Sequence, residues 1–281
     1  MSDEEQQDLR VLLTILEKID PWLGVVASDE PSGAWVVQPR SPLSTDDART
    51  HPYRVSHRAW MAVTPAVDFL ACLRGSIIGA RQGNQLSVRL HSYAQAGLVR
   101  GALENACCAV WLLAPPRMER VTNRLALEWM ELRPSYRLRE LTGSLPPRTI
   151  DQRQQQLVEL LLAAHATAAP TGPAPVIAAA VARKTLGGLT YAAIVRRAGE
   201  LSKFGADSTE ATWKMCSGLA HGDASATIGL LATEVLQQID PGISLARITP
   251  QVKLLVMATA IACGMTGLAL HLLQERGRPP Y

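Results

Sequence analysis

The sequence has little of what usually marks a metal site. Its five cysteines are an odd number, and none stands in a C-x-x-C pair or in a Cys/His ligand spacing. Adjacent Cys107 and Cys108 would point about 100° apart on a helix, so they cannot share one tetrahedral site without help from other residues. We therefore expect free buried thiols in a reducing compartment, with neither a metal nor a cofactor.

Strong charge is also missing. The net charge is +3, from 28 basic and 25 acidic residues, which is weaker than the basic signal typical of nucleic-acid-binding domains. Nearly all the cations are arginine, a side chain that suits phosphate and carboxylate partners, although the many alanines point to a GC-rich coding sequence as the cause. The segment Met1–Glu5 is acidic, the opposite of a secretory leader. We expect a cytoplasmic protein.

Strand signals are scarce. Only Trp35–Val37 and Ile243–Ile248 read as short β-like windows, and no repeat of solenoid period is present. We expect an all-α, multi-helix bundle at residues 56–275, after an N-terminal helix and a long irregular loop in residues 1–55. A Pro- and Gly-rich stretch at 168–175 is the candidate internal linker. Helical periodicity covers residues 3–19, 57–80, 86–114, 117–141, 149–166, 176–184, 190–203, 208–221, 224–239 and 250–275.

One segment has the composition of a membrane span. Leu254–Leu270 carries no charge, and its length is near the lower limit for crossing a bilayer. It is rich in Ala, Gly and Thr and is bounded by Lys253 and His271. These features favour a helix buried in the bundle over a membrane anchor, so we expect no membrane association.

A single charged pair interrupts the apolar segment 94–114. Arg100 and Glu104 are four residues apart and therefore share one face of the expected helix. Two interpretations remain open: a buried ion pair that fixes the helix register, or a polar pocket in which Arg100 meets a ligand anion.

A basic stripe follows on the next expected helix. Arg117, Arg120 and Arg124 are spaced at i, i+3 and i+7, so they lie on one face. Such a stripe is usually a solvated surface, and phosphate binding is the functional alternative.

The segment Trp213–Asp223 concentrates the side chains suited to chemistry. Lys214, Ser217 and His221 line up on one helix face, with Trp213 on the adjoining face. Asp207 is the expected N-cap of this helix, Gly222 the expected C′ residue and Asp223 the expected N-cap of the next helix. A histidine at a helix C-terminus is stabilised as the cation, which favours an acid or anion-binding role.

Two other roles for His221 can be compared with this one. Ser217 and His221 could touch as a nucleophile and its base, but no G-x-S-x-G elbow or oxyanion hole accompanies them. His221 could instead only hydrogen-bond across a helix–helix corner. The other histidines are isolated and read as loop, surface or satisfied core residues.

The pattern Leu98-Val99-Arg100-x-x-x-Glu104 and the late Ser217-Gly218-Leu219-Ala220-His221-Gly222 together resemble the HEPN-like helical proteins, over roughly residues 60–275. The resemblance implies a helical bundle that often dimerises. Many members of that family are metal-independent ribonucleases of toxin–antitoxin, phage-defence or RNA-processing systems, and others are non-catalytic. The nuclease members carry an Arg, four to six intervening residues and then a His. Here Lys214, with six residues intervening, is the nearest cation, and Lys lacks the guanidinium fork.

Two functions follow as hypotheses. In the first, a homodimer acts on RNA at a composite site, with His221 as acid or base, Lys214 and Arg100 binding phosphate and Ser217 positioning the substrate. In the second, a non-catalytic module binds a protein partner or small ligand in a polar pocket between helices. An enzyme of small-molecule metabolism is a third idea, but the Glu-x-x-His metal pattern of helical bundles is missing. The candidate catalytic residues are His221, Lys214 and Ser217, and the candidate ligand-binding residues are Arg100, Glu104, Arg120, Arg124 and Trp213.

Overall fold

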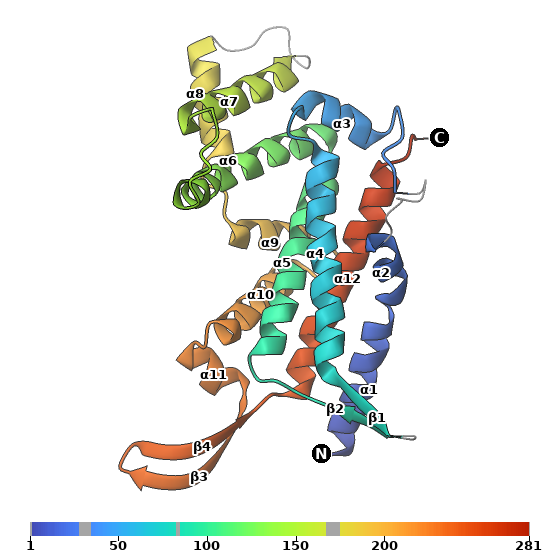
Figure 1. Ribbon diagram of the computed structural model, residues 1–281, viewed down its shortest axis with the longest axis vertical. Helices are drawn as coiled ribbons and strands as arrows, with labels where there is room; N and C mark the ends of the chain where they lie inside the picture. Colours follow the sequence, from blue (N-terminus) through green and yellow to red (C-terminus); the bar gives the residue numbers. More distant parts are fainter. Residues whose placement is uncertain (1, 28–34, 83–84, 167–174, 281) are drawn as a thin grey trace.

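The computed structural model describes residues 2–27, 35–82, 85–166 and 175–280. The fold is an all-α multi-helix bundle with two small β-hairpins (Figure 1). The first four helices are α1 (Asp3–Glu17), α2 (Asp20–Val26), α3 (Pro42–Thr50) and α4 (Val55–Ile77). The next are α5 (Ala94–Leu113), α6 (Arg117–Leu141), α7 (Ile150–Ala166) and α8 (Pro175–Leu186). The last are α9 (Tyr191–Glu200), α10 (Ala206–Ala220), α11 (Ala224–Leu230) and α12 (Val252–Arg276).

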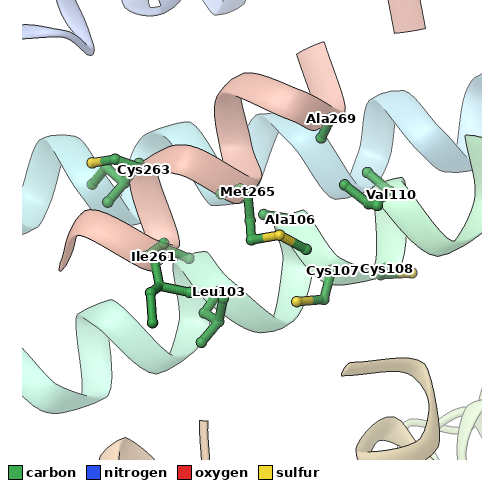
Figure 2. Packing of buried hydrophobic residues seen from close by; sticks show 14 of the residues in the cluster. Leu103, Ala106, Cys107, Cys108, Val110, Ile261, Cys263, Met265 and Ala269 are labelled. Carbon is green, nitrogen blue, oxygen red and sulfur yellow. The ribbon is translucent and has the colours of Figure 1, made fainter. Parts of the chain in front are cut away.

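The larger hydrophobic core lies between the long helices α4, α5 and α12, with α1 packed against α12 (Figure 1). Side chains of α5 and α12 interdigitate along its centre, as Figure 2 shows. The residues labelled there include Leu103, Ala106 and Val110 from α5 and Ile261, Met265 and Ala269 from α12. These positions recur every three or four residues on each helix, which is the spacing that places apolar side chains on one face.

A second, smaller core joins α6, α7 and α8 at one end of the long helices (Figure 1). Its buried members include Val121 and Leu125 from α6, Leu157 and Leu161 from α7, and Leu186 from α8. Helix α6 serves both parts, because it also packs against α3 and α5. It runs continuously from Arg117 to Leu141 with Pro134 inside it. The expected linker at 168–175 lies almost wholly outside the described residues.

The expectation of an irregular loop across residues 20–55 is wrong for much of its length. Helices α2 and α3 occupy Asp20–Val26 and Pro42–Thr50. Both have a proline in the first turn, where the missing N–H costs nothing, and Ser41 caps α3 by accepting a hydrogen bond from the N–H of Ser44. Pro21 and Pro42, two of the prolines in this segment, therefore lie at helix starts. Trp35–Val37, expected to be β-like, forms no strand.

The helix expected over residues 224–239 is also wrong beyond Leu230. The chain instead forms a hairpin of β3 (Ala232–Asp240) and β4 (Ile243–Thr249), so the β-like window at Ile243–Ile248 is confirmed. Gly242 has a φ of +85°, which a turn with Pro241 before it requires. The hairpin projects from the bundle (Figure 1), and its residues are almost all exposed. A shorter hairpin, β1 (Ile78–Gln82) and β2 (Gln85–Val88), also replaces expected helix.

Two helices are long and apolar enough to cross a membrane by length and composition alone, α5 and α12. In α5, 67% of the most apolar stretch is buried inside the protein, and in α12 the share is 50%. Core helices of soluble proteins pass the same test of composition. The uncharged stretch Leu254–Leu270 lies in α12 and packs against α1, α4 and α5, as expected for a bundle helix.

Candidate functional site

The central contact of the site joins α5 to α10 through one carboxylate. Glu104 Oε2 accepts a hydrogen bond from Trp213 Nε1 at 2.8 Å and another from Arg100 Nη2 at 3.2 Å. The Arg100 guanidinium also lies over the Trp213 indole, with its Cζ 5.8 Å from the ring centroid. Arg100, Glu104 and Trp213, three of the predicted ligand-binding residues, therefore form one cluster. Glu104 and Trp213 are 109 positions apart in the sequence.

Helices α5 and α10 run antiparallel at this contact. Glu104 of α5 contacts Trp213 of α10. Gly97, seven residues before Glu104, lies beside Ala220, seven residues after Trp213: a methyl group built on Gly97 would lie 3.7 Å from the Ala220 Cβ. Arg100 therefore lies at the level of Ser217. We call this contact the α5–α10 seam, made of Gly97, Arg100, Glu104, Trp213, Ser217 and Ala220.

His221 lies at the end of the seam. It is the C-cap of α10, and its side chain is exposed and forms no hydrogen bond or ion pair with another described residue. Gly222 follows with a φ of +68°, as expected for a C′ glycine, and Asp223 caps α11 by accepting from the N–H of Ala226. The expected N-cap at Asp207 is wrong, because Gly205 is the N-cap and the helix begins at Ala206, two residues before the expected start. The side chains of His221 and Ser217, both described, form no hydrogen bond with each other.

Lys214 points away from the seam. Its Nζ lies 2.7 Å from Glu210 Oε1, and Glu210 Oε2 also accepts a hydrogen bond from Arg196 at 2.9 Å. Hydrogen bonds from Lys214 and Arg196 lower the pKa of the Glu210 carboxyl. The Lys214 side chain is 63% exposed. The structure thus separates Lys214 from Arg100, although the sequence groups it with Ser217 and His221.

The thiol in this region is not a nucleophile. Cys216 precedes Ser217 and is buried on α10, and burial raises the pKa of its thiol to about 12. The reactive form of cysteine is the thiolate, so Cys216 stays protonated and inert near neutral pH. Cys263, buried on α12, has its pKa raised to about 12 by the same cause.

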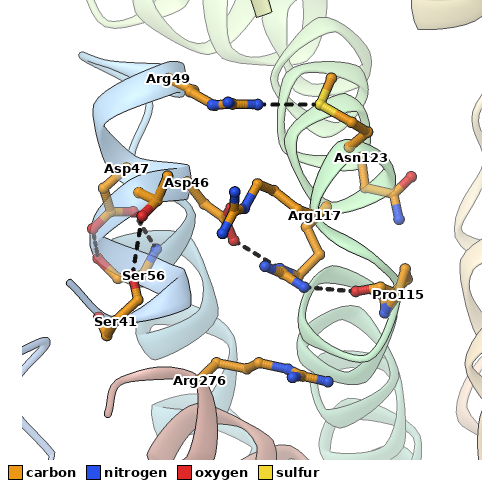
Figure 3. A network of polar contacts seen from close by, with 12 residues as sticks. Ser41, Asp46, Asp47, Arg49, Ser56, Pro115, Arg117, Asn123 and Arg276 are labelled. Carbon is orange, nitrogen blue, oxygen red and sulfur yellow. Dashed lines mark hydrogen bonds and ion pairs between the residues drawn. The ribbon is translucent and has the colours of Figure 1, made fainter. Parts of the chain in front are cut away.

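Arg120 belongs to a different contact, which corrects the expected solvated stripe. Its Nε donates to Asp46 Oδ2 at 2.7 Å and its Nη1 donates to the Pro115 carbonyl at 2.8 Å (Figure 3). Arg117 Nε lies 3.8 Å from Asp46 Oδ1. The Asp46 side chain is fully buried and that of Arg120 is 5% exposed. Burial raises the pKa of the Asp46 carboxyl, while the hydrogen bond from Arg120 opposes that rise.

Arg124 is likewise structural in its surroundings. It is buried, its Nε donates to the Arg54 carbonyl at 3.3 Å, and its Nη2 donates to Glu128 Oε2 at 3.1 Å. Its guanidinium lies over the Tyr53 ring. Arg120 and Arg124 therefore hold α3 and the start of α4 against α6, and neither joins the α5–α10 seam.

Comparison with protein-family models, with curated proteins and with solved structures finds no match for this chain. The site is therefore interpreted from its own geometry. Within the described ranges, no three His, Cys, Asp or Glu side chains gather closely enough to hold a metal ion.

Sequence reasoning missed Asp46 and Gly97. Asp46 lies in a segment that was expected to be irregular, and nothing in its neighbourhood marks it as the buried partner of Arg120. Gly97 could have been noticed, because a glycine one turn before a charged pair in an apolar helix signals close approach by another helix.

Proposed function

We propose that this chain is a HEPN-like protein that acts on RNA through the α5–α10 seam. The observation that carries the proposal is the state of Arg100. Its buried Nε has no hydrogen-bond acceptor among the described residues, and its side chain remains 31% exposed. A buried N–H without an acceptor costs free energy. A phosphate oxygen that accepts a hydrogen bond from it would therefore bind with a more favourable free energy than one that binds a fully solvated arginine.

The residues of the seam divide into distinct roles in this proposal. Arg100 binds a phosphate through its guanidinium fork, and Glu104 with Trp213 holds the guanidinium in place. His221, exposed at the C-terminal end of α10, acts as an acid or as an anion ligand. Ser217, at the level of Arg100, positions the substrate. Lys214 contributes little, because its Nζ is directed to Glu210 and away from the seam.

The proposal places the complete site at a homodimer interface in the cytoplasm. The exposure of His221 leaves its imidazole accessible to a second copy of the chain. An isologous interface around the ends of two α10 helices would bring two His221 side chains and two phosphate-binding arginines together.

A small-ligand pocket at the seam has less support. The cavity that adjoins it, between α5, α10 and α12, has a volume of about 40 Å³ and mainly apolar walls such as Val99, Leu219 and Leu254. Pockets for small molecules commonly have about 300–1,000 Å³. The cavity is therefore too small for a substrate.

The test is an RNA cleavage assay without added metal, on wild type and on His221→Ala, Arg100→Gln and Lys214→Gln. We expect the first two variants to lose about 100-fold or more in rate, as is common for an acid–base group or a phosphate contact. Lys214→Gln, the matched control on the same helix, should stay within about twofold because an exposed ion pair contributes little.

A binding assay in low salt separates the remaining outcomes. RNA binding that depends on Arg100, without cleavage, would establish a non-catalytic RNA-binding protein. Neither cleavage nor binding, or equal losses in all three variants, would reject the seam as an RNA site.

A further inference from the structure

A second site is formed by the C-terminal half of α6, the following loop and the start of α9. These segments enclose a cleft of about 780 Å³, whose walls include Tyr136 and Arg139 of α6, Arg153 of α7 and Tyr191 of α9. None of these residues belongs to the α5–α10 seam. The volume lies within the range of about 300–1,000 Å³ that small-molecule sites occupy.

The charge that faces this cleft is positive. Its two carboxylates are already paired: Glu131 with Arg58 at 2.5 Å and Glu128 with Arg124 at 3.1 Å. Arg139 and Arg153 line the same cleft and have no carboxylate partner among the described residues. Two guanidinium charges therefore remain uncompensated in one concave surface.

Two polar atoms of the cleft residues are buried without a partner. The Tyr136 hydroxyl and the Arg153 Nε have no hydrogen bond to any described residue. Native proteins pair nearly all such atoms, and each unpaired one costs free energy that a ligand can recover. By contrast, the Tyr191 hydroxyl is engaged by Glu131 Oε1 at 3.3 Å, and burial with the nearby Glu131 charge raises its pKa to about 12.

We propose that this cleft binds a phosphate monoester that carries a flat or apolar group, of about the size of a mononucleotide. A phosphate dianion matches the guanidinium groups of Arg139 and Arg153, which have no carboxylate partner among the described residues, although Arg153 Nη1 donates to the Tyr53 hydroxyl at 3.3 Å. The Tyr136 hydroxyl and the Arg153 Nε each gain a hydrogen-bond partner, and the apolar wall of Met130, Leu132 and Leu138 receives the organic group. The phosphate comes either from a free mononucleotide or from the terminus of a nucleic-acid strand.

Calorimetric titration with AMP, adenosine and inorganic phosphate tests the site in the full chain. We expect saturable binding of AMP that is at least about tenfold tighter than that of adenosine, since a phosphate hydrogen-bonded to arginine contributes about that much. Arg139→Gln should weaken AMP binding about tenfold or more, and Tyr136→Phe should weaken it severalfold. Arg139 is exposed, so its replacement leaves the fold intact, and a thermal melt verifies this.

Arg137→Gln is the matched control. Arg137 lies two residues earlier on the same helix, carries the same charge and is paired with Glu140 outside this cleft. AMP binding by Arg137→Gln within about twofold of wild type supports the site. Equal losses in Arg137→Gln and Arg139→Gln, or AMP binding no tighter than adenosine, would overturn the proposal.

A final pair of probes identifies the source of the phosphate. Oligonucleotides with and without a 5′-phosphate are titrated against wild type and Arg139→Gln. A preference for the phosphorylated strand that disappears in Arg139→Gln assigns the site to strand termini. Tight AMP binding with no such preference assigns it to a free mononucleotide. These titrations use Arg139 and not Arg100, so their outcome does not depend on the function of the seam.

Discussion

Two arginine–carboxylate pairs in this molecule differ mainly in how far they are closed to water. Asp46 and Arg120 have side-chain exposures of 0% and 5%, whereas Glu104 and Arg100 have 22% and 31%. Asp46 and Arg120 lie on different helices, α3 and α6 (Figure 3), while Arg100 and Glu104 lie one turn apart on α5. The sequence marks the open pair as a site and shows nothing of the closed one.

The difference has a physical consequence for function. A closed pair has lost its hydration, so removing one partner leaves the other charge buried without compensation. The role of such a pair is therefore to hold its two helices in register. An open pair keeps part of its hydration and can exchange a water molecule for a ligand atom. Arg100 is thus suited to binding, and Arg120 is suited to holding α3 on α6.

Removing the closed carboxylate should have the largest effect. We expect Asp46→Ala to lower the free energy of unfolding by about 3–5 kcal/mol, because Arg120 is left buried without its partner. Urea denaturation followed by circular dichroism measures the change. Asp68→Asn, an exposed aspartate on α4, is the control. A loss no larger than that of the control would show that the α3–α6 contact does not depend on the pair.

Removing the open carboxylate should have a smaller effect. We expect Glu104→Ala to cost about 1–2 kcal/mol, since Trp213 and Arg100 lose a half-buried acceptor while water replaces part of it. Glu104→Gln retains an acceptor oxygen for Trp213 and should lose less than half of that amount. The indole fluorescence of Glu104→Ala should shift to the red as water reaches the ring. A cost as large as that of Asp46→Ala would remove the distinction between the two pairs.

The closed pair should also respond to acid. Burial raises the pKa of the Asp46 carboxyl in the folded protein above its ordinary value of 3.8. The folded protein then binds more protons than the unfolded chain, so the contribution of Asp46 to stability rises as the pH falls from neutral through that raised pKa. Asp46→Asn cannot titrate there. The stability of wild type relative to Asp46→Asn should therefore increase from pH 7 to pH 4, and a constant difference would contradict this.

The smallest effect is expected at a third pair, Lys214 with Glu210, whose lysine side chain is 63% exposed. Lys214 and Glu210 meet on the surface of α10, where solvent screens their attraction. Lys214→Gln should leave the urea midpoint unchanged within error. A clear loss of stability would show that the stability contributions of the three pairs do not follow their exposure to solvent.

Short-range signals predicted much of the fold. The helical class, the long helix α12, the glycine C′ at Gly222 and the cap at Asp223 follow from periodicity and end residues within a few positions, whereas α5 begins at Ala94, eight residues after its expected start. The region after Leu230 was predicted wrongly, because Val235, Leu236 and Ile239 fit a helical spacing as well as a strand. The Pro241-Gly242 turn was the signal that favoured a hairpin.

The sequence by itself determined the pairing of Arg100 with Glu104, since four residues on one helix bring their side chains together. Only the tertiary structure decided that Trp213 completes this pair from 109 positions away and that Asp46 buries Arg120 from 74 positions away. It also decided that Lys214 turns from the seam toward Glu210. The physical reason is that periodicity specifies which residues share a face, while burial and partner depend on which other helix packs against that face.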